Sequence, residues 1–76
     1  MRLSDIQFQI AHKQAELAEK KWWRDHFIVR RTELRKRNAP TSMLTRYDLD
    51  LIDVIEKINL LNIELYDLQD RLLEPV

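Results

Sequence analysis

Residues 44–72 read LTRYDLDLIDVIEKINLLNIELYDLQDRL, and this stretch decides the fold. From Leu44 to Leu72 an apolar side chain recurs at every third or fourth residue without a break. This alternation is the heptad pattern of a helix that packs along its whole length against another helix. We call these positions the core stripe: Leu44, Tyr47, Leu51, Val54, Ile58, Leu61, Leu65, Leu68 and Leu72.

The first half of the chain also favours a helix, because good helix formers run to about Arg37 without a breaker. Ser4 and Gln7 have the spacing of a capping box, which marks a helix start. The chain contains no glycine, which the tight turns of β-hairpins favour. The sequence therefore predicts an all-α fold.

The predicted architecture is a single domain, residues 1–76, folded as an antiparallel two-helix hairpin. One helix spans about 4–37 and the other about 43–73, with a short loop at about 38–42 between them. Asn38 can take the left-handed conformation that ends a helix, and Pro40 disfavours helix at the residue before it. Thr41 or Ser42 is expected to cap the second helix, and Pro75 to stop it.

The first helix carries two apolar rows, and the row with heptad spacing is predicted to face the second helix. We call this row the alanine stripe: Phe8, Ala11, Ala15, Ala18, Trp22, Asp25, Val29 and Thr32. Its alanines allow a close approach of another helix, and Trp22 is expected in the core. Asp25 is its one ionisable residue, expected to pair with an arginine or to fix the register. The other row is Leu3, Ile6, Ile10, Leu17 and Ile28.

The second helix also has more apolar surface than one neighbouring helix can bury. We call the surplus the Leu/Ile stripe: Leu49, Ile52, Leu60, Ile63 and Tyr66. A homodimer of hairpins, forming a four-helix bundle, would cover it because each helix would then have two neighbours. The alternative is that the surplus docks on a different protein, as in a small subunit of a larger complex.

The two halves of the chain carry opposite charge, although the whole chain is neutral. Residues 1–46 hold eleven Lys/Arg and five Asp/Glu, and residues 47–76 hold two Lys/Arg and eight Asp/Glu. In an antiparallel hairpin the basic end of the first helix lies near the acidic start of the second, so charge-matched pairing is expected. Nucleic-acid binding by the basic face is the alternative.

The candidate contact surface lies on the second half of the first helix, where aromatic and basic side chains interleave. Its residues are Trp23, Phe27, Arg30, Arg31 and Leu34, extended by Arg35 and Arg37. An aromatic row edged with arginine has the composition of a protein-binding hot spot. The same row would also suit a second buried side in an oligomer, so both interpretations stay open for Trp23.

Several functional classes find no support in the sequence. Without glycine there is no Gly-rich phosphate loop, and without cysteine there is no disulfide or thiolate metal site. His12 and His26 lie about 21 Å apart along a helix, too far to share a metal. No catalytic residues, cofactor site, metal site, small-molecule substrate or membrane span is expected.

The expected function is therefore non-enzymatic. We expect a cytoplasmic interaction or regulatory protein that binds another macromolecule, most simply another protein, and that also pairs with itself. There are two alternatives. One is an RNA- or DNA-binding regulator that uses the basic face, and the other is a small subunit of a larger complex.

Overall fold

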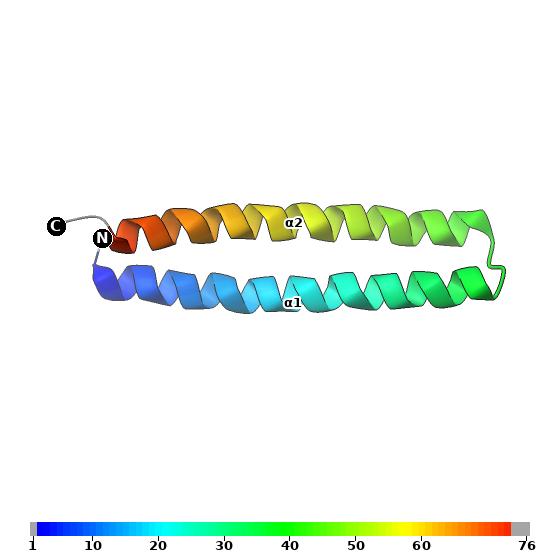
Figure 1. Cartoon of the computed structure of the whole chain (residues 1–76), viewed down its shortest axis with the longest axis horizontal. Coiled ribbons are helices and arrows are strands. Elements are labelled where there is room, and N and C mark those ends of the chain that lie inside the picture. Colours follow the sequence, from blue (N-terminus) through cyan, green and yellow to red (C-terminus); the bar gives the residue numbers. More distant parts are fainter. Residues whose placement is uncertain (1, 74–76) are drawn as a thin grey trace.

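The computed structural model describes residues 2–73 and contains two long helices, α1 (Leu3–Lys36) and α2 (Thr41–Leu73). The helices lie side by side and run in opposite directions, as Figure 1 shows. The resulting rod measures 59 × 14 × 13 Å. The first residues of α1 and the last residues of α2 therefore lie at one end, and the loop lies at the other. The predicted all-α hairpin is confirmed.

α1 begins earlier than the sequence predicts. The carbonyl oxygen of Arg2 accepts hydrogen bonds from the backbone N–H groups of Asp5 and Ile6, at 3.0 and 3.2 Å. Ser4 thus already lies inside the helix, and no side chain caps this end. The predicted capping box at Ser4 is wrong, because a residue with helical backbone angles is no longer in the N-cap position.

The loop uses the predicted Asn38 and Pro40, but not the predicted helix cap. Asn38 has φ of 57°, the left-handed conformation that asparagine tolerates better than most residues. The carbonyl oxygen of Pro40 then accepts the N–H groups of Met43 and Leu44, at 3.0 and 3.4 Å, which starts α2. Thr41 and Ser42 both lie inside α2, so the prediction that one of them caps this helix is wrong. Pro75 lies outside the described residues.

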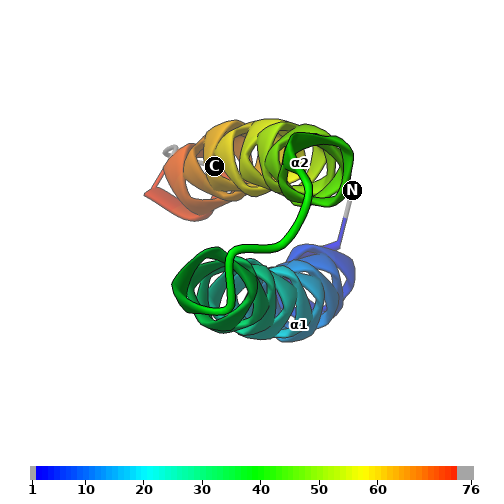
Figure 2. The same cartoon turned by 90° about the vertical axis from the view of Figure 1, so that its right-hand side faces the viewer.

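The core stripe of α2 is confirmed as the side that faces α1. The buried apolar side chains of α2 all belong to it: Val54, Ile58, Leu61, Leu65 and Leu68. The other members of the stripe are half-buried. Figure 2, a view along the rod, shows that the helices change their relative position from one end to the other. They wrap around each other, as a sustained heptad pattern requires.

α1 faces α2 with a different row from the one predicted. Ile6 is its only buried apolar residue among those described, and four half-buried apolar residues continue the row: Ile10, Leu17, Phe27 and Leu34. The same side of α1 also holds half-buried Lys13, Lys20, Arg24 and Arg31. Long basic side chains can cover apolar surface with their methylene stems while the charge stays in water.

The alanine stripe, predicted to face α2, is instead exposed along its whole length. Trp22 is 59% exposed, so its predicted place in the core is wrong. Asp25 is also exposed and pairs with Arg24 at 3.0 Å, which leaves it no role as a buried register marker inside the hairpin. The physical reason is volume. The row with Ile6, Leu17 and Phe27 offers larger side chains to the leucines of α2 than the alanines can.

Candidate interaction surfaces

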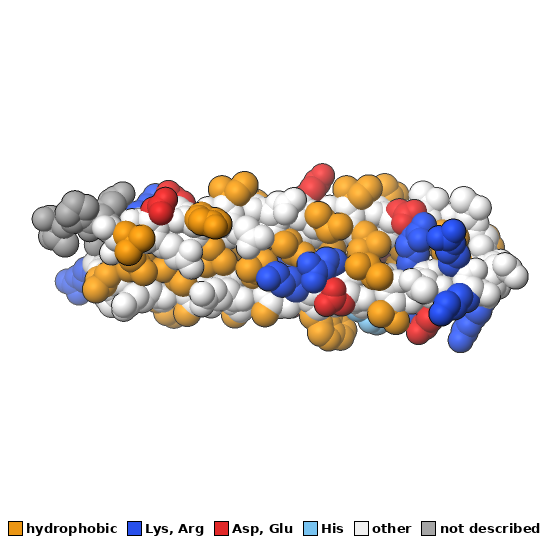
Figure 3. Space-filling view, in the orientation of Figure 1, with side chains coloured by type: hydrophobic (Ala, Val, Ile, Leu, Met, Phe, Trp, Pro, Cys, Tyr) orange, Lys and Arg blue, Asp and Glu red, His pale blue; other side chains and the backbone are white. Residues whose placement is uncertain are grey.

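The alanine stripe forms an apolar face on the outer side of α1. Its three largest side chains, Phe8, Trp22 and Val29, are 73%, 59% and 55% exposed. At 100° per residue the stripe lies roughly opposite the side of α1 that meets α2. Figure 3 shows hydrophobic side chains projecting from both long edges of the rod. This face is regular in spacing and uncovered in the hairpin.

The Leu/Ile stripe forms a matching face on the outer side of α2. All five of its members are exposed, and Ile63 is 66% exposed. The stripe also lies roughly opposite the side of α2 that meets α1. Acidic side chains of Glu56, Asp67 and Asp70 interrupt or flank it on the same side of the helix. A partner of this face therefore meets a bulky apolar row with negative charge along it.

The aromatic residues of the predicted contact surface turn toward α2 and not fully outward. Trp23 is 39% exposed, whereas Phe27 and Leu34 are half-buried. The Phe27 ring meets Tyr47 of α2 edge-on, with ring centroids 6.2 Å apart, and Trp23 packs on Phe27 at 5.6 Å. Trp23 is thus partly an intramolecular packing residue, and its remaining exposed edge borders a groove between the helices.

Two arginines of the same predicted surface, Arg30 and Arg31, have bonding partners on different helices. Arg31 forms two hydrogen bonds to the Asp48 carboxylate, through Nε and, at 3.4 Å, through Nη2. Arg30 pairs with Glu33 at 3.0 Å, and a hydrogen bond with the Tyr47 hydroxyl raises the pKa of Arg30. The predicted charge matching between the two helices is therefore present at Arg31.

Arg35 and Arg37 are exposed, and no ion pair involves either of them within residues 2–73. Lys36, and Arg46 near the start of α2, are also exposed and form no ion pair within the same residues. These four cations lie close to the loop end of the rod. They form a basic group separate from the Trp23 surface, so the predicted site divides into two parts.

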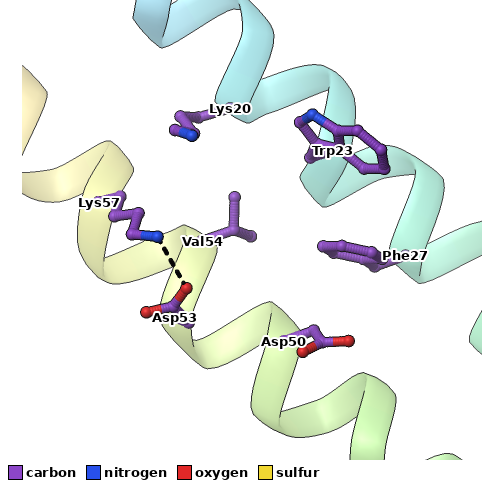
Figure 4. Close-up of a pocket in the computed structure, with 7 residues that line it drawn as sticks. All are labelled: Lys20, Trp23, Phe27, Asp50, Asp53, Val54 and Lys57. Atoms are coloured by element: carbon purple, nitrogen blue, oxygen red, sulfur yellow. Dashed lines mark ion pairs between the residues drawn. The ribbon is translucent and has the colours of Figure 1, made fainter.

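A shallow groove runs between the helices beside Trp23 (Figure 4). Its lining residues are Lys20, Trp23, Phe27, Asp50, Asp53, Val54 and Lys57. The Lys57 ammonium lies 3.0 Å from the Asp53 carboxylate, and both side chains point along α2 at the rim. Farther along the groove Lys13 pairs with Glu64, and this hydrogen bond raises the pKa of Lys13. The residues from α2 were not among those predicted from the sequence.

The two histidines take part in local contacts. The His12 Nε2 lies 2.9 Å from Glu16, and the His26 ring stacks on Trp22 with centroids 5.2 Å apart. Within residues 2–73 no group of three or more His, Asp or Glu side chains is placed to hold one metal ion. In the same part of the chain neither helix has the length of apolar sequence that crossing a membrane requires.

Comparison with known proteins gives no relative. No protein-family model, no curated protein and no solved structure matches this chain.

Proposed function

We propose that this is a non-enzymatic helical protein that acts by binding another protein along an apolar outer face of the hairpin. The main support is the Leu/Ile stripe, five exposed apolar residues on the side of α2 that the hairpin leaves uncovered. Several large apolar side chains exposed on one side of a small protein are typical of an interaction site. A helix of the partner with apolar residues at the same spacing and basic residues beside them would fit it.

Pairing with a second copy is part of the same proposal. A hairpin with so few buried side chains is marginal alone, because a chain of 76 residues has a small core. Binding to a second hairpin would bury more apolar surface and so add stability. A closed four-helix bundle, the shape predicted from the sequence, would cover the Leu/Ile stripe, so a dimer that leaves this stripe free for another protein must use a different face.

A photo-crosslinking residue at position 66 tests the protein partner directly. Tyr66 is 72% exposed and lies in the Leu/Ile stripe, so benzoylphenylalanine can replace it with little effect on the hairpin. After irradiation of the cells that produce the protein, we expect a discrete adduct with a different protein, identified by mass spectrometry.

The matched control places the same photo-crosslinker at Gln69, which is exposed on α2 but lies outside the stripe. The control is expected to give no adduct of that mass. Adducts only with a second copy, or equal adducts from both positions, would contradict a protein partner on this face.

Nucleic-acid binding is a second candidate, favoured by one observation. The group Arg35, Lys36, Arg37 and Arg46 has no ion pair in the described part of the chain, so these cations are available to phosphates. Titration with a fluorescent 20-nucleotide RNA and the corresponding DNA duplex tests it. If the basic group contacts about four phosphates, affinity should fall roughly 50-fold for the RNA and roughly 150-fold for the DNA duplex between 50 and 200 mM salt. Binding that is absent at low salt, or unchanged by salt, rules this function out.

A further inference from the structure

We infer that the alanine stripe of α1 is a two-fold interface with α1 of a second copy, with the two helices antiparallel. This inference rests on the proposed self-association and specifies its face and direction. The stripe keeps an unbroken heptad spacing from Phe8 to Thr32. It lies roughly opposite the side of α1 that packs on α2, so a second copy can cover it without disturbing the hairpin.

Charge selects the antiparallel direction. Four basic residues of α1 face α2 and are left out of this comparison: Lys13, Lys20, Arg24 and Arg31. Without them, residues 3–19 carry a net charge of −3, from three acidic residues, and residues 20–36 carry +2, from four Lys/Arg and two acidic residues. An antiparallel pair places the negative half of each α1 beside the positive half of the other, whereas a parallel pair places like halves together. A parallel pair would also set Asp25 opposite Asp25 of the second copy.

Side-chain size selects the register. If the two-fold axis passes close to residue 20, each large residue of the stripe meets a small one of the second copy. Trp22 then faces Ala18, Val29 faces Ala11, and Phe8 faces Thr32, because each pair is equally distant from residue 20. This alternation lets the backbones stay close along the whole stripe, as interdigitated packing requires.

A competing register is shifted by one heptad. It would pair Glu19 with His26 at the rim, but it would set Phe8 beyond the end of the second α1 and leave that ring uncovered. Exposed rim pairs contribute little, whereas burial of a phenyl ring is among the larger contributions that one side chain can make. The register centred near residue 20 is therefore favoured, despite bringing the two Glu19 side chains near each other.

The resulting dimer would have its four helices in a row, in the order α2, α1, α1 and α2. This order differs from a closed four-helix bundle, in which every helix has two neighbours. It leaves both Leu/Ile stripes exposed at the outer edges of the dimer, where the proposed protein partner can reach them.

Cysteine crosslinking tests the inference on the intact chain, which has no cysteine of its own. The variants Ala11→Cys and Val29→Cys change exposed positions. In the proposed dimer the thiol at position 11 of one copy faces the thiol at position 29 of the other, whereas the two copies of position 11 are about 27 Å apart along the helices. After mixing and mild oxidation we expect at least about tenfold more covalent dimer from the mixture than from either variant alone, because disulfides need adjacent Cα atoms.

The control is a mixture of Ala11→Cys with Ile63→Cys, whose thiol lies on the Leu/Ile stripe and should give no excess of covalent dimer. Efficient crosslinking by Ala11→Cys alone would show a parallel pair and overturn the inference. No crosslinking in any mixture, with a dimer seen by sedimentation equilibrium, would place the dimer contact on another face. A monomer at all concentrations would overturn self-association, while the Tyr66 crosslink would still test the protein partner separately.

Discussion

Replacing Leu61 by alanine is expected to lower the free energy of unfolding by about 2–4 kcal/mol. Leu61 is 7% exposed and lies in the middle of the core stripe, where α1 covers it. The deletion removes buried methyl groups and leaves a space that two long straight helices can close only in part. Since small domains are stable by only about 5–15 kcal/mol, the loss should be visible in both urea and thermal unfolding.

The matched control is Ile63→Ala, two residues farther along α2 on the opposite side. Ile63 is exposed, so its truncation should change stability of the purified protein by less than about 0.5 kcal/mol. Equal losses from both substitutions would show that the Leu/Ile stripe is already covered in the purified protein, and they would contradict its proposed availability to a partner.

A double substitution, Ile52→Asp with Ile63→Asp, is expected to abolish the adduct formed from position 66. Both side chains belong to the Leu/Ile stripe and are more than half exposed. Each carboxylate would have to lose its water against an apolar partner surface, at a cost of several kcal/mol, which corresponds to at least about 100-fold weaker binding. The helix content and melting temperature should stay nearly unchanged, because neither position packs on α1.

The control for this experiment is Asn62→Asp, which adds a carboxylate on the same helix at an exposed position outside the stripe. It should leave the adduct in place. If the double variant still formed the adduct, the Leu/Ile stripe would not be the partner-binding face. If the double variant unfolded, the stripe would contribute to the stability of the protein itself.

The core stripe could be predicted from the sequence because α2 has only one row without a charged residue. On α1 the same reasoning failed, because two rows were available and the correct one contains Lys13, Lys20, Arg24 and Arg31. The alanine stripe was preferred because its heptad spacing is unbroken, whereas basic residues interrupt the apolar residues of the other row. The structure shows that Lys13 and Arg31 reach Glu64 and Asp48 across the interface.

The candidate site was predicted in part. Trp23, Phe27 and Leu34 do form one row, but the groove beside them also needs Asp50, Val54 and other residues of α2. Their position follows from the hairpin itself, since residues equally distant from the loop meet. Trp23 lies opposite Val54, and Phe27 opposite Asp50, at nearly equal distances from Ala39. Which residues of the two helices lie opposite each other can be predicted from the sequence once the loop is placed. How deeply each aromatic ring is buried cannot be predicted in this way.

The shared end of the rod also has a mechanical consequence. Leu3 and Leu73 lie at the same end of a rod 59 Å long, so tension applied between them would pull α1 and α2 apart like the two sides of a zipper. The contacts would break one turn at a time, beginning near Ile6 and Leu68 and reaching the loop last. Such a hairpin yields to a small force over a long extension.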